Sequence, residues 1–120
     1  MGLFNFKSDN TLTDYDSIDA VKIQSNLLMM TETADRQKAI KKLRIGSLVN
    51  FKRTRRNGQT VYVVSDYKTG KTIGEISYGS SDYLAQNYGN HKMLGKVTEI
   101  GHLTPIGQVN QVLIEYKVYL

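Results

Sequence analysis

The chain has 120 residues and no cysteine, and its 16 Lys and Arg residues outnumber its 11 Asp and Glu residues, giving a formal net charge of +5. This length predicts one compact domain that needs no metal, cofactor or disulfide to support its core. The absence of cysteine excludes disulfides, thiolate zinc sites and cysteine nucleophiles. No apolar run approaches the roughly 18 residues of a membrane span, and the first residues lack the features of a secretory signal. We therefore expect a cytoplasmic protein without a membrane partner.

Charge is distributed unevenly along the chain. Residues 1–35 carry two basic and six acidic side chains, whereas residues 36–120 carry fourteen basic and five acidic ones. Within 36–56 there are nine basic residues and no acidic residue. Such a block is typical of a surface that binds a polyanion, which makes nucleic acid the favoured partner. The alternative is a solvated face that keeps a small domain soluble.

Residues 1–45 are predicted to form an N-terminal extension that is partly helical. Thr13–Asp16 resembles a helix start, because Thr13 can cap the helix and acidic residues follow in its first turn. The apolar residues that come next do not form a single helical stripe, and Val21–Gln24 is equally compatible with a short strand. Both interpretations of this segment stay open at the level of sequence.

A clearer helix is predicted over about 34–43, with Thr33 as its N-cap. Ile40 and Leu43 lie three residues apart and should pack inward, while Gly46 is placed where a left-handed residue commonly ends a helix. Three basic side chains share the outward arc of this helix: Lys38, Lys41 and Lys42.

From residue 47 onward the hydrophobic pattern changes to a period of two, which predicts strands. The runs 48–56 and 59–66 flank Asn57-Gly58, the residue pair favoured by a two-residue type I′ turn, because both positions need a positive φ. Gly70 suits the bulge position of a second hairpin, which leads into a third strand over 71–78. These signals predict three consecutive antiparallel strands.

A short helix is predicted over 81–88, with Ser80 as its cap and Gly89 at its end. Two further strands follow, over about 92–100 and 109–119. The last strand alternates cleanly, with four residues on its inner face: Val112, Ile114, Tyr116 and Val118. Five strands with a helix between the third and fourth is the chain order of an OB-type barrel. The predicted fold class is therefore α+β, mainly β, with a small OB-like five-stranded barrel over 46–120.

The first hairpin carries the most informative residues. With Asn57-Gly58 as its turn, Phe51 faces Val64 and Arg53 faces Tyr62, so aromatic and arginine side chains share one face. That composition is typical of a surface that stacks bases and neutralises phosphates. The same aromatic residues could instead belong to the core, with the arginines reaching past its rim, and core is the favoured interpretation for Phe51.

In an OB-type barrel, oligonucleotides bind across the middle strands between two loops, one of which is the tip of the first hairpin here. The candidate phosphate contacts are Lys52, Arg53, Arg55, Arg56, Lys38, Lys41 and Lys42, and the candidate base-stacking residues are Tyr62 and Tyr78. Single-stranded nucleic acid, DNA or RNA, is the expected partner, and the protein is not expected to be an enzyme.

Catalytic and metal-binding patterns are weak. The two histidines, His91 and His102, are eleven residues apart and have no metal-ligand spacing, so we interpret both as surface loop residues. The segment Thr69-Gly70-Lys71-Thr72 echoes the end of a phosphate-binding loop, but it lacks the required earlier glycine and precedes a predicted strand. A hairpin turn accounts for it better.

Five short motifs in the second half of the chain form a recognisable pattern. They are Tyr62-Val63-Val64-Ser65-Asp66, Gly70-Lys71-Thr72-Ile73-Gly74-Glu75-Ile76, Tyr83-Leu84-Ala85, Gly95-Lys96-Val97-Thr98-Glu99-Ile100 and Val112-Leu113-Ile114-Glu115-Tyr116. Over roughly residues 46–118 this pattern resembles a HIRAN domain. The resemblance implies a modified OB-type barrel and binding of DNA, notably of single-stranded 3′ ends. The family's NP.D..A turn, which helps to form its ligand site, is replaced here by Arg55–Thr60, so generic single-strand affinity is expected instead of 3′-end recognition.

A second function class is a protein-interaction barrel, an accessory protein of phage or plasmid type without a nucleic-acid role. The acidic N-terminal segment could dock on a partner, or it could fold over the basic face of its own chain and screen it. The residues that would screen the basic face are Asp9, Asp14, Asp16 and Asp19.

Overall fold

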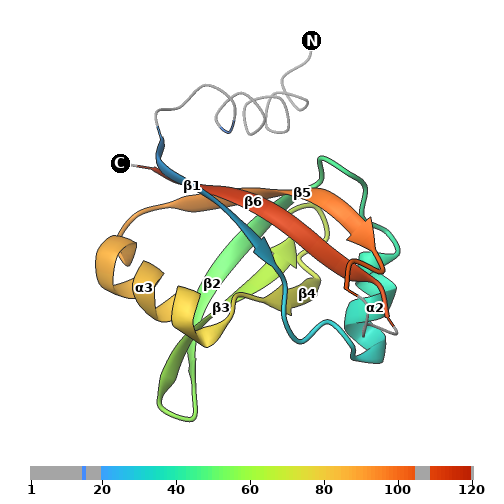
Figure 1. Ribbon diagram of the computed structural model, residues 1–120, viewed down its shortest axis with the longest axis horizontal. Helices are drawn as coiled ribbons and strands as arrows, with labels where there is room; N and C mark the ends of the chain where they lie inside the picture. The colour runs from blue at the N-terminus through green and yellow to red at the C-terminus, as the bar shows by residue number, and fades with distance from the viewer. Residues whose placement is uncertain (1–14, 16–19, 105–108, 120) are drawn as a thin grey trace.

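The computed structural model describes residue 15 and residues 20–104 and 109–119 of the chain (Figure 1). Within these residues the fold is α+β and mainly β, as predicted, with one antiparallel sheet of six strands in the order β1-β6-β5-β2-β3-β4. The elements are β1 (Ala20–Leu27), α2 (Ala34–Ile40), β2 (Leu48–Arg56), β3 (Gln59–Asp66), β4 (Thr72–Glu75), α3 (Tyr78–Tyr88), β5 (Met93–Gly101) and β6 (Gln111–Tyr119).

The prediction of five strands is wrong, because Ala20–Leu27 forms an additional strand. This β1 pairs with β6 from Ala20 opposite Tyr119 to Leu27 opposite Leu113, so it belongs to the same sheet as the later strands. The predicted helix start at Thr13–Asp16 lies outside the described residues except for Tyr15, which is buried. β6 supplies the hydrogen-bond partners for one side of this strand.

The strand pairing does not close into a barrel. Among the described strands, β1 and β4 form the two edges of the sheet. The edges approach each other at one bridge just after β1, where the Met29 N–H donates to the Glu75 carbonyl at 2.8 Å and the Glu75 N–H donates to the Met29 carbonyl at 2.9 Å. The observed architecture is therefore an open, curved sheet with a single bridge between its edges.

The first hairpin agrees with its prediction in both strand bounds and register. Asn57 and Gly58 have φ angles of 53° and 77°, as a type I′ turn requires. Phe51 lies opposite Val64, and Arg53 lies opposite Tyr62. In Figure 1 the tip of this β2–β3 hairpin projects away from the body of the molecule, with α3 beside it and α2 near β4.

The helix α2 is shorter than predicted, because its last turn tightens. The Thr33 hydroxyl caps it by accepting from the Arg36 N–H at 3.3 Å, as predicted. Beyond Ile40 the backbone N–H groups of Lys42 and Leu43 donate to carbonyls three residues earlier, which bends the chain and buries Leu43 beside Ile40. Gly46 lies outside the helix, in a separate turn before β2.

The helix α3 begins earlier than predicted, and β4 is correspondingly shorter. Ser77, and not Ser80, is its N-cap, and the helix ends before Gly89 as expected. Ser81 is buried inside the first turn, where its hydroxyl accepts from the Tyr62 N–H at 3.0 Å and donates to the Ile76 carbonyl at 3.1 Å. A helical serine thus satisfies one backbone N–H of β3 and one backbone carbonyl of the segment after β4.

The core is formed largely by alternate residues of the middle strands. The predicted inner face of β6 is confirmed, since its four side chains are fully buried: Val112, Ile114, Tyr116 and Val118. Phe51 packs against this core, with its ring centroid 5.1 Å from that of Tyr116. The core interpretation of Phe51 is therefore confirmed.

Candidate nucleic-acid interface

Four basic side chains extend from β2 toward the tip of the projecting hairpin, and the structure gives them different surroundings. Because side chains alternate along a strand, Arg53 and Arg55 point to one face of the hairpin, and Lys52 and Arg56 point to the other. Arg53 donates to the Gly89 carbonyl at 3.2 Å, at the end of α3. Lys52 is exposed.

Arg56 is bound to a buried carboxylate, although 38% of its own side chain is exposed. Its guanidinium donates to both oxygens of the Glu75 carboxylate, with Nη1–Oε1 and Nη2–Oε2 distances of 2.5 and 2.8 Å. Arg36 adds a third bond to the same carboxylate at 3.1 Å and also donates to the Met30 carbonyl. Arg56 could therefore bind a phosphate only by breaking its ion pair with Glu75. Arg56 was a predicted phosphate contact, and this ion pair, which sequence reasoning missed, gives it a structural role.

The Glu75 carboxylate is nearly inaccessible, with 4% of its side chain exposed. Burial alone would raise the pKa of this carboxyl, but the hydrogen bonds and positive charges of Arg56 and Arg36 outweigh burial and lower the pKa below its ordinary value. The hydrogen bonds and negative charge of Glu75, with a further contribution from Tyr78, raise the pKa of Arg56. Glu75 and Arg56 are therefore both charged at neutral pH, and the guanidinium of Arg36 adds a second positive charge to the cluster.

The two predicted base-stacking tyrosines differ in accessibility. Tyr62 is 5% exposed and belongs to the core cluster, so its ring is not a surface platform. It faces inward because it shares the face of β3 that carries Val64. Tyr78 lies in the first turn of α3 and is 41% exposed. Of the two, only Tyr78 presents a ring to solvent.

The structure brings Tyr78 and Arg55 together in one groove between the hairpin tip and the start of α3. This tip groove has a volume of about 490 Å³, and its lining residues are Arg55, Gly58, Gln59, Thr60, Tyr78, Gly79 and Asp82. The Arg55 guanidinium donates to the Gly58 carbonyl at 2.5 Å, which orients it along the turn. Asp82, whose carboxylate also accepts from Gln86, was not among the predicted residues. No pattern in the sequence connects Asp82 with a hairpin that lies more than twenty residues earlier.

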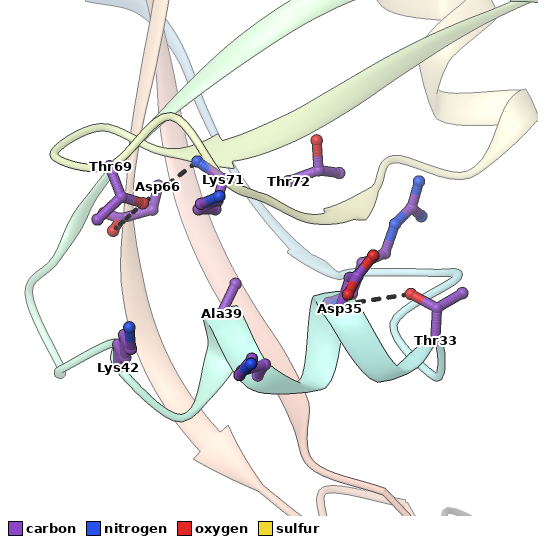
Figure 2. Close-up of a pocket in the computed structure, with 10 residues that line it drawn as sticks. Thr33, Asp35, Ala39, Lys42, Asp66, Thr69, Lys71 and Thr72 are labelled. Carbon is purple, nitrogen blue, oxygen red and sulfur yellow. Dashed lines mark hydrogen bonds between the residues drawn. The ribbon is translucent and has the colours of Figure 1, made fainter.

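The predicted lysines of α2 contribute to a different groove. This helix groove lies between α2 and the turn from β3 to β4, has a volume of about 700 Å³, and is lined by Lys38 and Lys42 but not by Lys41 (Figure 2). Lys71, which sequence reasoning did not select, lies on its opposite wall. Figure 1 places α2 away from the projecting hairpin tip, so the predicted basic residues form two separate surfaces.

His91 and His102 are both exposed, as predicted. Within the described residues, no group of three or more His, Asp or Glu side chains could hold a metal ion, and no helix there has the length and apolar character needed to cross a bilayer. The acidic residues expected to screen the basic face, from Asp9 to Asp19, lie outside the described part of the chain.

We compared the chain with protein-family models, curated proteins and solved structures, and nothing matches it.

Proposed function

We propose that this protein is a non-enzymatic module that binds single-stranded nucleic acid, and that the tip groove receives a base. The observation that carries the proposal is the pairing of Arg55 with Tyr78 in one groove, although they lie 23 positions apart in sequence. An exposed tyrosine ring can stack on any base, and an adjacent guanidinium can stack on the base or neutralise its phosphate. A groove with one aromatic ring, one cation and one carboxylate suits a base better than a phosphate chain.

Other residues near the tip groove recognise the base, contact the phosphates or support the hairpin. Asp82 accepts a hydrogen bond from an amino group of the bound base, as carboxylates do with cytosine. Lys52, Arg53 and Arg55 contact the phosphates on either side, because their charges face solvent along the projecting hairpin. Arg56 supports the hairpin through its ion pair with Glu75.

We also propose that the six-stranded sheet is an OB-like barrel. The bridge between Met29 and Glu75 brings the two sheet edges together, which supports an OB-like barrel that is closed at one point. The HIRAN resemblance supports the same location for the ligand, since that family's ligand site includes the turn at this hairpin. The substitution of that turn by Arg55–Thr60 favours affinity for the strand itself over recognition of its 3′ end.

Fluorescence anisotropy of a labelled single strand of ~20 nucleotides, titrated at several salt concentrations, tests the proposal. Three phosphate contacts predict that log affinity falls against log salt with a slope of about −2, because each contact on a single strand contributes about −0.7. Tyr78→Ala should weaken binding about 5- to 150-fold, which corresponds to ~1–3 kcal/mol of base stacking. Arg55→Ala should weaken binding and flatten the slope by about 0.7.

Lys68→Ala is the matched control, because it removes one charge from an exposed turn residue that does not line the tip groove. Its affinity and salt slope should stay close to those of the unmodified protein. Equal losses for Lys68→Ala and Arg55→Ala would mean that net charge, and not the tip groove, governs binding. No binding at low salt would overturn the function and leave the protein-interaction alternative in its place.

A further inference from the structure

The helix groove is a second candidate ligand site, separate from the tip groove. Its size and its charge both suit a ligand. Its volume of about 700 Å³ lies within the range of ordinary small-molecule sites. One wall is α2 and the residues after it, and the other is the turn between β3 and β4. Figure 2 shows Lys42 on the first wall and Lys71 on the second. The residues that line it are Thr33, Asp35, Arg36, Lys38, Ala39, Lys42, Asp66, Thr69, Lys71 and Thr72.

Two of the charged groups in this lining are already occupied. Arg36 is held by Glu75 and by the Met30 carbonyl. Asp66 is buried, and its carboxylate accepts from the Thr69 hydroxyl at 2.9 Å and from the Lys68 N–H at 3.3 Å, inside its own turn. The charges of Arg36 and Asp66 are therefore already engaged by partners within the fold, and other residues provide the charge available to a ligand.

Three lysines supply that charge. Among the residues that the structure describes, Lys38, Lys42 and Lys71 have no ion-pair partner within 4.0 Å. The one other carboxylate in the lining is that of Asp35, which is exposed in the first turn of α2. Three ammonium groups against one free carboxylate leave the groove cationic at neutral pH.

Packing and backbone hydrogen bonds set the backbone positions of these lysines on the two walls. The end of α2 is anchored by the buried side chains of Ile40 and Leu43. The opposite turn is closed by two backbone hydrogen bonds, from the Asp66 N–H to the Lys71 carbonyl at 2.9 Å and from the Gly70 N–H to the Asp66 carbonyl at 2.8 Å. Like charges that line one space repel each other, and an anion between them relieves that repulsion.

We propose that the helix groove is an anion site that binds phosphate groups through Lys38, Lys42 and Lys71. Lysine is a compact point charge that suits phosphate oxygens, and the side chain of Thr72 adds a hydroxyl donor at the same wall. Two sources share this chemistry: a free polyphosphate and a stretch of nucleic-acid backbone. The site does not depend on the proposed role of the tip groove, which contributes no residue to it.

The first test is titration of the full chain with inorganic tripolyphosphate at low salt, followed by calorimetry. The double variant Lys38→Ala/Lys71→Ala removes one lysine from each wall and should weaken binding about tenfold or more, since two charge-assisted contacts are lost. The control Lys41→Ala/Lys68→Ala removes the same charge from exposed neighbours that do not line the groove, and its affinity should change less than about twofold. Equal losses in both variants, or no binding by the unmodified protein, would overturn the site.

The same variants in the oligonucleotide titration identify the source of the phosphate. If a strand occupies the groove, Lys38→Ala/Lys71→Ala should also flatten the salt slope by about 1.4, for two contacts. If the slope is unchanged while tripolyphosphate binding is lost, the ligand is a free polyphosphate, and both results support the site. Arg55→Ala should retain tripolyphosphate binding, so failure of the tip groove and failure of the helix groove give different results.

Discussion

Arg56 and Glu75 form a two-point ion pair that joins the end of β2 next to the hairpin turn to the edge strand β4, with Nη1–Oε1 and Nη2–Oε2 distances of 2.5 and 2.8 Å. The planar guanidinium matches the carboxylate fork, and Arg36 donates a further bond to the same carboxylate. The preceding residue, Arg55, points to the opposite face of β2 and lines the tip groove. Two consecutive arginines therefore have different roles, because successive side chains of a strand point in opposite directions.

This division predicts opposite phenotypes for neighbouring substitutions. Arg56→Ala should lower the urea midpoint of unfolding clearly, because it leaves a nearly inaccessible carboxylate with Arg36 as its remaining partner. Arg55→Ala should change the free energy of unfolding by no more than about 0.5 kcal/mol while it weakens binding of a single strand. Urea denaturation and fluorescence anisotropy on both variants check the prediction. Similar stability of the two variants would contradict the structural role of Arg56.

The same cluster predicts a loss of stability in acid. In an unfolded chain a Glu carboxyl titrates near 4.3, whereas Arg56 and Arg36 hold the folded pKa of Glu75 lower, against the effect of burial. The ion pairs therefore contribute stability above about pH 4.3, and this contribution is lost as the pH falls through the folded pKa. Urea midpoints measured from neutral to acidic pH should record the loss. Glu75→Gln should be less stable at neutral pH and should lose less on acidification, and equal acid sensitivity would assign the effect to other carboxyls.

Two glycines form a matched pair for testing backbone packing. A Cβ atom on Gly74 would lie 2.9 Å from the Leu28 Cβ and 3.0 Å from the Met29 carbonyl oxygen, where the chain after β1 crosses β4. Gly74→Ala should therefore destabilise the fold by about 1–3 kcal/mol. A Cβ on Gly79, inside α3, would meet no atom within 4 Å, so Gly79→Ala should be neutral or stabilising by up to about 1 kcal/mol. Thermal unfolding of both variants checks the difference, and equal stability would contradict the close crossing at Gly74.

The buried hydroxyl of Tyr116 should make the stability of the fold depend on pH in the alkaline range. Its hydroxyl lies 2.6 and 2.9 Å from the side-chain oxygens of Gln24 and Asn26 on β1, and burial raises its pKa to about 12. Because the unfolded residue titrates near 10, its contribution to stability is complete below about pH 10 and is lost as the pH rises toward 12. Tyr116→Phe should cost about 1 kcal/mol at neutral pH, from the lost hydrogen bond, and should lose less stability above pH 10. Denaturation of both proteins at neutral and alkaline pH measures this, and identical alkaline profiles would exclude Tyr116 as the cause.

Local signals predicted much of the secondary structure. The bounds and register of the first hairpin follow from Asn57-Gly58, because the positive φ angles of its turn depend on those two residues alone. The inner face of β6 follows from strict alternation of apolar residues. The segment Ala20–Leu27 was ambiguous, because its pattern fits a helix and a strand equally and the choice depends on pairing with β6, more than eighty residues later.

For the candidate site, the order of residues specifies which side chains are basic or aromatic and which of them share a face of the hairpin. Contacts between distant segments of the chain set which of those side chains are accessible. Tyr62 is buried because its face of β3 covers the core, and Arg56 is held because Glu75 reaches it from another strand. The fold also places Arg55 with Tyr78 in one groove, and Lys38 and Lys42 with Lys71 in another. Burial and charge pairing depend on contacts between residues far apart in the chain, and local sequence patterns do not encode these contacts.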